Sequence, residues 1–176
     1  MNTNWTPPIL AFVAASGTGK TTLLEQIIPL LRSRGLRIAV IKHTHHDFDL
    51  DQPGKDSYRL RAVGAQQVML ASRHRWALLT EHQQLAEPQL AELLAALEQK
   101  DLDMILVEGF KHENIDKIEV HRPTLGKPPL YSQDERIIAI ACDAPPTPVT
   151  TLPLLDLNNP PTIADFICRH CGLSHT

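Results

Sequence analysis

Several features that would place a chain outside the ordinary globular proteins are absent from this sequence. No apolar run approaches the roughly 18 residues that a membrane-spanning helix needs. The three cysteines are an odd number and give no disulfide framework. A formal net charge of −3 argues against a broad nucleic-acid-binding surface. The opening residues, MNTNWTPP, carry neither a cationic segment nor a signal-like apolar core. We therefore expect a cytoplasmic protein whose partners include neither nucleic acid nor a membrane.

The length and composition favour one globular domain. A chain of 176 residues, 43% of them apolar, is long enough for a single well-formed core. No internal repeat or low-complexity tract divides it. We expect one nucleotide-binding domain over residues 1–176, with 1–8 and 172–176 as flexible ends.

A phosphate-binding loop is the most informative feature that is present. The apolar run Ile9–Ala15 predicts a buried strand, and Lys20 opens a helix. The loop between them, Ser16–Gly19, contains two glycines that let backbone N–H groups curl around an anion at the helix N-terminus. In such a Walker A loop the lysine reaches the β- and γ-phosphates, and the following hydroxyl, on Thr21, binds Mg²⁺. The predicted cofactor-binding residues of this segment are Ser16, Gly17, Thr18, Gly19, Lys20, Thr21 and Thr22.

One position departs from the usual G-x-x-x-x-G-K-[ST] spacing. Ala14 stands where the first glycine is expected. A methyl group is the smallest possible change, and the position lies where strand becomes loop, so we interpret the segment as a variant P-loop.

The rest of the chain alternates strands and helices, which predicts the α/β class. Strands are expected at 36–41, 67–71, 76–80, 104–107, 117–121 and 137–141, and helices at 20–34, 55–63, 89–100 and 161–170. Residues 67–71 and 76–80 are separated by a short polar turn and predict an antiparallel hairpin. We expect a P-loop NTPase fold: a largely parallel central sheet, helices on both faces and some antiparallel strands.

A polar segment, KHTHHD, directly follows the second predicted strand. It lies at the carboxyl edge of a parallel sheet, where ligands bind in open α/β folds. Lys42 and His43 are best placed there to contact phosphate or to sense Mg²⁺. Two alternatives remain open: a divalent metal site made from His43, His45, His46 and Asp47, or a simple solvated loop.

The predicted buried strand 104–107 is followed by a carboxylate. P-loop proteins place an acidic residue at such a strand end, close to Mg²⁺ and its water. Glu108 is that residue here, whereas Asp103 stands at the far end of the strand. We predict Lys20 and Glu108 as the catalytic residues, and Thr21 and Glu108 as the metal-binding ones.

Asp143 is the candidate for the nucleotide base. It follows the strand 137–141, at the edge where guanine-specific proteins place an aspartate against the N1 and N2 hydrogens of the base. The usual [NT]-K-x-D signature is absent from the chain, so the sequence leaves guanine and adenine both open.

Two further groups of residues have competing interpretations. Arg73 and Arg75 in the hairpin turn could meet phosphates or a partner, or be solvated. The tail holds Cys168 and Cys171, a C-x-x-C spacing that can bind zinc, although no second ligand pair shows the expected spacing. A frayed terminus is the alternative for the tail.

The segments AASGTGKTTLL, IKHTHHDFDLDQPGKDSYRLRAVGA, RWALLTE and LDMILVEGFKHE together resemble one family, the molybdopterin-guanine dinucleotide biosynthesis adaptors (MobB). The resemblance implies a P-loop GTPase of the metal-cofactor-maturation branch that binds GTP and Mg²⁺, hydrolyses GTP slowly if at all and forms a homodimer. It implies assistance to the guanylyltransferase MobA, with molybdoenzymes as further partners. It also assigns Gly17, Gly19, Lys20, Thr21 and Thr22 to phosphate and magnesium, and makes Glu108 the second carboxylate.

We therefore expect a GTP-binding accessory protein of molybdenum cofactor biosynthesis that is at most a slow GTPase. Neither a Gln nor an arginine finger is identifiable that would accelerate hydrolysis, and such an arginine is worth roughly 10³–10⁵ in rate. The first alternative is a small-metabolite kinase that uses ATP, with Arg59, Arg61, Arg73 and Arg75 as lid residues. The second is a metal chaperone that uses the histidine loop or the cysteine tail.

Overall fold

The computed structural model describes residues 7–44, 51–82, 84 and 86–173. Its contacts group the chain into two compact units. The sheet unit comprises Met1–His43 with Leu90–Thr176, and the hairpin unit comprises Thr44–Gln89. The single domain and the flexible ends expected from the sequence stay predictions.

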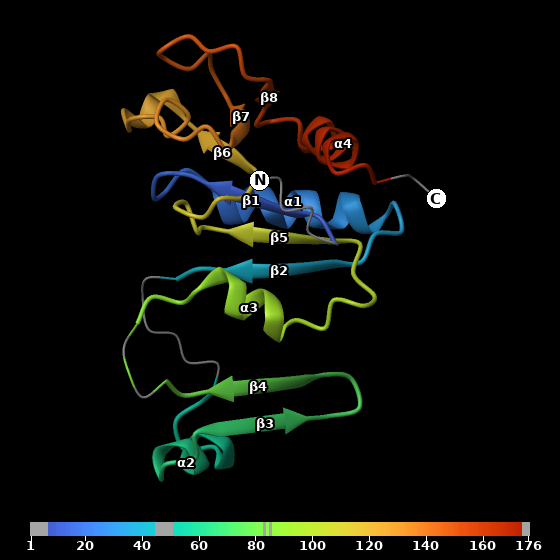
Figure 1. Cartoon of the computed structure of the whole chain (residues 1–176), viewed down its shortest axis with the longest axis vertical. Helices are drawn as coiled ribbons and strands as arrows, with labels where there is room; N and C mark the ends of the chain where they lie inside the picture. Colours follow the sequence, from blue (N-terminus) through green and yellow to red (C-terminus); the bar gives the residue numbers. More distant parts are fainter. Residues whose placement is uncertain (1–6, 45–50, 83, 85, 174–176) are drawn as a thin grey trace. The chain divides into compact units, whose positions relative to one another are not determined.

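A six-stranded sheet organises the sheet unit. Its order is β2-β5-β1-β6-β7-β8, and every neighbouring pair is parallel (Figure 1). The strands are β1 (Ile9–Val13), β2 (Ile38–Lys42), β5 (Met104–Glu108), β6 (Lys117–His121), β7 (Ile137–Cys142) and β8 (Leu154–Asp156). The largely parallel sheet is thus confirmed. Because all six strands run the same way, the polar residues that follow them gather at one edge.

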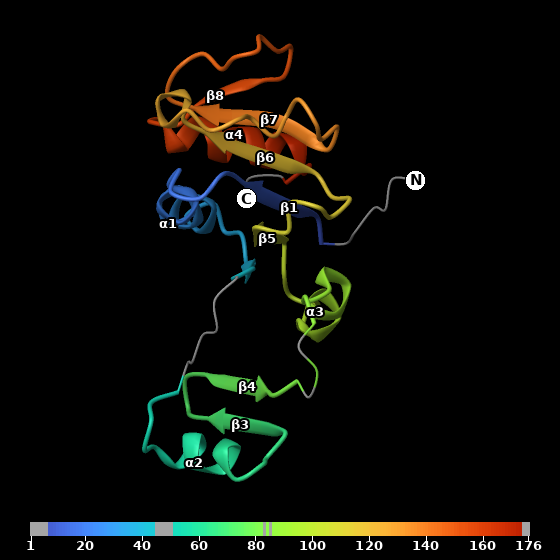
Figure 2. The same cartoon turned by 90° about the vertical axis from the view of Figure 1, so that its left-hand side faces the viewer.

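Helices cover both faces of this sheet, as the sequence predicts. Helices α1 (Lys20–Arg32) and α4 (Pro160–His170) share a buried cluster with Leu10 and Phe12 of β1. The alternate residues of β1, with Ala11 among them, face a second cluster that includes α3 (Leu90–Ala96). Figure 2 shows α1 and α3 on opposite sides of the sheet.

The first helix is amphipathic for the reason that its sequence suggests. Its buried residues are Leu23, Leu24, Ile27 and Leu31, which recur at helical spacing. The helix ends at Arg32, and the N–H of Gly35 donates to the Arg32 carbonyl oxygen at 3.0 Å. Gly35 has φ +83°, a left-handed conformation that glycine adopts without steric cost. This stop fixes the point from which β2 returns to the sheet.

The predicted hairpin is confirmed in the hairpin unit. Strands β3 (Gln67–Ala71) and β4 (Trp76–Thr80) pair antiparallel, next to the short helix α2 (Asp56–Ala62). The Ser72 N–H donates to the Arg75 carbonyl oxygen at 2.8 Å and closes the turn. No residue of α2, β3 or β4 is buried. The described residues of this unit thus have regular backbone pairing without a buried core of their own.

The structure differs from the sequence expectation at a few elements. Strand β8 (Leu154–Asp156) is a strand that the sequence did not predict. A 3₁₀ turn, Pro123–Leu125, lies within a segment that was expected to be loop. Three residues are too few to show a strand pattern, so β8 depends on its pairing with β7. Helix α3 ends at Ala96, short of the expected residue 100, and the Leu94 carbonyl oxygen accepts hydrogen bonds from the Leu97 N–H at 3.3 Å and the Gln99 side chain at 2.5 Å.

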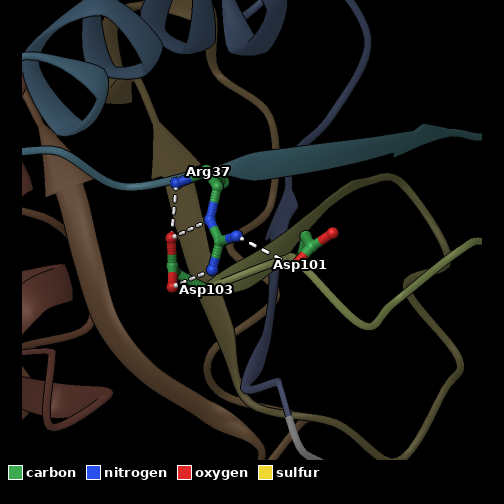
Figure 3. A network of polar contacts seen from close by, with 3 residues as sticks. All are labelled: Arg37, Asp101 and Asp103. Carbon is green, nitrogen blue, oxygen red and sulfur yellow. Dashed lines mark hydrogen bonds and ion pairs between the residues drawn. The ribbon is translucent and has the colours of Figure 1, made fainter.

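Asp103 lies at the amino edge of the sheet, far from the P-loop, as expected. Its carboxylate accepts hydrogen bonds from Arg37 at 2.7 to 3.2 Å, and Asp101 accepts another from the same guanidinium at 3.2 Å (Figure 3). The Arg37 side chain is 57% exposed, so solvent screens these ion pairs. Asp103 therefore joins β2 to β5 and belongs to no ligand site. Within the described residues, no helix has the length and apolar character to cross a bilayer.

Candidate nucleotide-binding site

The P-loop has the backbone that anion binding requires. It leaves β1 after Val13 and enters α1 at Lys20. Gly17 and Gly19 have φ +82° and +93°, in the left-handed region where a side chain would be strained. The Thr18 side chain is buried, and its hydroxyl donates to the Ala15 carbonyl oxygen at 3.0 Å. Because that hydroxyl holds the loop closed, the backbone N–H groups are what this segment offers to a phosphate.

Three predicted residues meet beside the P-loop. The Thr21 hydroxyl donates to Glu108 Oε1 at 2.7 Å. The Lys42 ammonium lies 3.2 Å from Thr21 Oγ1 and 3.3 Å from Glu108 Oε2. The sheet register produces this meeting, because Glu108 pairs with Lys42 on one side and with Phe12 on the other. We call Thr21, Lys42 and Glu108 the magnesium-side cluster, after the ion that the sequence analysis expects at Thr21 and Glu108.

The electrostatics of Lys20 reflect the same cluster. Burial lowers the pKa of the Lys20 ammonium, the Glu108 carboxylate opposes that change, and Lys42 adds to it. Two lysines and one buried carboxylate thus share the site. Such an excess of positive charge at a P-loop is suited to a polyphosphate.

His43, which follows β2, contacts the tight turn at the end of β5. The His43 N–H donates to the Glu108 carbonyl oxygen at 2.9 Å, and its ring stacks on Phe110 at a centroid distance of 4.6 Å. Gly109 has φ +99°, and a Cβ there would lie 2.9 Å from His43 Cβ. Phe110 has φ +52°, which is rare for a bulky residue and stores strain in this turn. His43 therefore contacts the strand end that carries Glu108.

Asp143 lies on the other side of the P-loop, with a partner that the sequence did not indicate. Its Oδ2 accepts a hydrogen bond from Arg122 Nη1 at 2.5 Å, and Arg122 Nε donates to the Thr18 carbonyl oxygen at 3.0 Å. Arg122 follows β6 directly, at the carboxyl edge. This position after a predicted strand could have identified Arg122 as a site residue from the sequence. The sequence analysis predicted only Asp143 on this side of the site.

A cavity of about 210 Å³ adjoins this second side. It is lined by Gly19, Thr22, Leu23 and Gln26 at the start of α1, by Arg122, and by Leu157 and Asn158 after β8. Its wall therefore combines two apolar side chains, Leu23 and Leu157, with two amides and one guanidinium.

The sequence analysis left open a metal site in the histidine loop or in the cysteine tail. His45, His46 and Asp47 lie outside the described residues. In the tail, burial raises the pKa of the Cys171 thiol to about 12, so that it stays protonated at neutral pH. In the part of the chain that is described, no three His, Cys, Asp or Glu side chains gather as a metal site.

The arginines considered as lid residues belong to the hairpin unit. Arg61 Nη1 lies 2.6 Å from Glu81 Oε1, and Arg59 Nη1 lies 3.8 Å from Asp56 Oδ1. Arg73 and Arg75 are exposed around the hairpin turn. These contacts are internal to the unit and give no independent support to a kinase.

The parallel sheet, the glycine loop and the helix that it opens define the P-loop NTPase fold. The comparisons with known proteins then narrow this class. Residues 9–143 match the sequence model of the family described as "Molybdopterin guanine dinucleotide synthesis protein B", MobB. The chain belongs to this family.

Similar proteins agree with that assignment. The chain is 50% identical over 161 residues to the molybdopterin-guanine dinucleotide biosynthesis adapter protein of Escherichia coli, and the match covers 91% of each chain. A protein of the same name from Haemophilus influenzae is 46% identical, with 91% of this chain and 87% of the relative covered. A crystal structure of molybdopterin-guanine biosynthesis protein B superposes with a TM-score of 0.71 at 29% identity, covering 92% of this chain and 99% of that one. These findings confirm the family and the fold inferred from the motifs.

Proposed function

We propose that the chain is a GTP-binding accessory protein of molybdopterin guanine dinucleotide synthesis. The observation that carries the nucleotide part is the magnesium-side cluster, in which Thr21 and Glu108 meet at 2.7 Å beside the P-loop. The names of the relatives, which are adapter proteins of this biosynthesis, carry the pathway. The P-loop amides and Lys20 hold the β- and γ-phosphates in this proposal.

The same cluster fits a magnesium ion by the chemistry of its donors. Mg²⁺ prefers oxygen ligands, and Thr21 and Glu108 supply a hydroxyl and a carboxylate side by side. The Lys42 ammonium lies 3.3 Å from Glu108 Oε2, and this ion pair supports a role of the carboxylate in binding positive charge. Bound Mg²⁺ would neutralise charge between the β- and γ-phosphates. In our proposal Thr21 and Glu108 hold the ion and its water, and Lys42 and His43 sense the γ-phosphate.

We expect hydrolysis to be weak. Among the described residues, the side-chain hydrogen bonds and ion pairs of Thr21 and Glu108 involve each other and Lys42, with no glutamine or arginine. Around Thr21 and Glu108, the described residues therefore provide no such group to orient water or to neutralise transition-state charge. A turnover above about one per second without a partner would contradict this expectation, since that is the range of dedicated phosphoryl-transfer enzymes.

Calorimetric titration with GTP and then with ATP, each with Mg²⁺, tests the nucleotide proposal. We expect binding of GTP with clear preference over ATP, with the base near Asp143. Preference for ATP would overturn the proposal and favour the kinase. Transfer of a labelled γ-phosphate to an acceptor other than water would then identify that activity.

We further propose a homodimer that assists the guanylyltransferase MobA, and contact with molybdoenzymes as a secondary role. The hairpin unit supports an interface: Met69, Trp76 and Leu78 share one face of β3–β4 and are 61%, 60% and 45% exposed. We call these three residues the apolar stripe. A two-stranded hairpin without a core is marginal alone, so a second copy would supply the missing burial. Immobilised protein should retain purified MobA, and failure to retain it with GTP present would count against the adaptor role.

We also propose the cytoplasm as the place of action. Cys142, Cys168 and Cys171 are all free thiols, as expected where thiols are kept reduced. Fractionation of cells that produce the protein would test this location.

A further inference from the structure

The two sides of the P-loop carry different groups. Strand order puts β5 and β2 on one side of β1, so Glu108 and Lys42 meet there. Strands β6 and β7 lie on the other side, and they are followed directly by Arg122 and Asp143. The magnesium-side cluster therefore occupies the first side, and Arg122 is the cation of the second.

Two hydrogen bonds hold the Arg122 guanidinium in position, and its other N–H groups are available to a ligand. Its Nε donates to the Thr18 carbonyl oxygen, and its Nη1 donates to Asp143 Oδ2. Its Nη2 lies 3.9 Å from where a Cβ on Gly19 would stand, at the first turn of α1. An arginine has five N–H donors, so three remain for which the described residues supply no acceptor. The planar group is thus oriented in advance against the anion-binding loop.

The cavity supplies the second observation. Arg122 lines it together with Thr22, Gln26 and Asn158, and its side chain is 35% exposed. The cavity, of about 210 Å³, runs along the start of α1, from Gly19 to Gln26, and so adjoins the end of the helix that the P-loop opens. A ligand that enters the cavity therefore contacts a half-exposed guanidinium at the edge of the P-loop.

We propose that Arg122 is a nucleotide-binding residue that contacts the phosphate nearest the nucleoside. This inference rests on the proposed function, since it requires a nucleotide on the P-loop. Arg122 stands on the side away from Lys42 and Glu108, so it serves the part of the ligand that GDP and GTP share. Asp143 and the Thr18 carbonyl hold the guanidinium in position, and the cavity beside it receives the nucleoside.

The substitution Arg122→Met tests this role, because it removes the charge and keeps most of the length. We expect affinity for GDP and for GTP to fall by the same factor, about ten- to a hundredfold, as for loss of one charged hydrogen-bonding partner. The dependence of the dissociation constant on salt should also become shallower, since one charge no longer meets the phosphate. Arg122→Lys, which keeps the charge without the planar fork, should recover part of both effects.

Arg136→Met is the matched control. Arg136 is 39% exposed and pairs with Asp116 at 2.5 Å, just before β7 and so at the opposite edge of the sheet. It has the same charge and a similar ion pair. We expect its loss to leave both dissociation constants unchanged.

Three results would overturn the role of Arg122. The first is wild-type affinity for both nucleotides in Arg122→Met. The second is weaker binding with the salt dependence of the wild type, which is what a purely structural brace of the P-loop would give. The third is weaker binding of GTP alone, which would move Arg122 to the γ-phosphate. If Arg122→Met does not fold, the same measurements on Arg122→Lys decide.

The outcome is separable from that of the proposed function. A wild-type protein that binds no nucleotide overturns both. Wild-type binding that is lost in Lys20→Ala and retained in Arg122→Met overturns only the present inference.

Discussion

The sheet unit and the hairpin unit place their apolar residues in opposite ways. In the sheet unit, β1 and β5 are buried at every position, and two clusters fill the faces between sheet and helices. In the hairpin unit, no residue of α2, β3 or β4 is buried, and the apolar stripe is exposed. The first unit contains the core that stabilises it, whereas the second presents its apolar side chains outward.

This difference suits the two units to different roles, nucleotide binding in the sheet unit and association in the hairpin unit. The P-loop and its flanking strand ends need rigid positions, and buried parallel strands provide them. An interface needs exposed apolar surface, which a hairpin without a core provides. The variants below test whether the two units divide nucleotide binding and association in this way.

The largest effect is expected on association. Met69→Glu together with Leu78→Glu puts charge on the apolar stripe at paired positions. Burying each such side chain contributes roughly 1.5–3 kcal/mol, so we expect the dimer dissociation constant to rise by about a thousandfold. Light scattering after gel filtration should show a dimer for the wild type and a monomer for the variant. Gln67→Glu with Thr80→Glu, which adds the same charge to the polar end of this face, should stay dimeric; a monomeric wild type would refute the interface.

The second effect concerns stability. Leu31→Ala removes a fully buried side chain between α1 and α4 and should cost about 2–5 kcal/mol in urea unfolding. Leu70→Ala removes a side chain that is 40% exposed on β3 and should cost less than about 0.5 kcal/mol. Both are measured in the Met69→Glu, Leu78→Glu background, so that association does not contribute. Equal costs would show that the hairpin unit has a core of its own.

Lys20→Ala tests the nucleotide site alone. We expect GTP affinity to fall by about a hundredfold, the effect of losing a charge-assisted contact to phosphate, while the fold survives because Lys20 is outside the core. Calorimetry measures the affinity, and thermal unfolding checks the fold. Lys55→Ala removes the same charge from the hairpin unit and should leave affinity unchanged. Unchanged GTP binding in Lys20→Ala would refute the P-loop assignment.

The smallest effect concerns a buried carboxylate of β6. Glu119 accepts hydrogen bonds at 2.8 Å from the N–H groups of Leu130 and Tyr131. Glu119→Gln supplies one acceptor where two are needed, so we expect a loss of about 1–3 kcal/mol at neutral pH. Glu81→Gln alters an exposed ion pair of the hairpin unit and should cost less than about 1 kcal/mol.

The same residue gives a pH dependence with a defined sign. Burial raises the pKa of Glu119 above its usual 4.5, although the two N–H groups oppose the change. The folded protein therefore holds this proton more firmly than the unfolded chain does. The stability that it contributes is present below pH 4.5 and is lost as pH rises through the raised pKa. Urea unfolding at several pH values should show this decline in the wild type and not in Glu119→Gln; identical pH profiles would contradict the linkage.

Much of the fold was predictable because its signals are local. The strand at 117–121 and both hairpin strands have the predicted bounds, since alternation or an apolar run marks each of them. The P-loop was equally plain, with glycines where the backbone needs positive φ. Strand β8 was missed because three residues carry no period, and its place depends on its pairing with β7.

The sequence predicted the candidate site fully on the side of Glu108 and Lys42. It predicted only Asp143 on the side of Arg122. Glu108 and Lys42 could be selected because each ends an apolar strand. Arg122 also follows a strand, but a single arginine before a proline-containing loop has no distinguishing pattern. Its two partners, Thr18 and Asp143, come from different parts of the chain.

The sequence by itself determined the P-loop, the alternation of strands and helices, and the family, because these depend on residues close together in the chain. Tertiary structure decided which side chains meet. Thr21 and Glu108 are separated by 87 positions, and Arg122 and Thr18 by 104. Their contacts follow from the strand order β2-β5-β1-β6, which places the ends of distant strands on either side of one loop. A local pattern can identify a strand end, but only the register of the assembled sheet places its side chain against a particular partner.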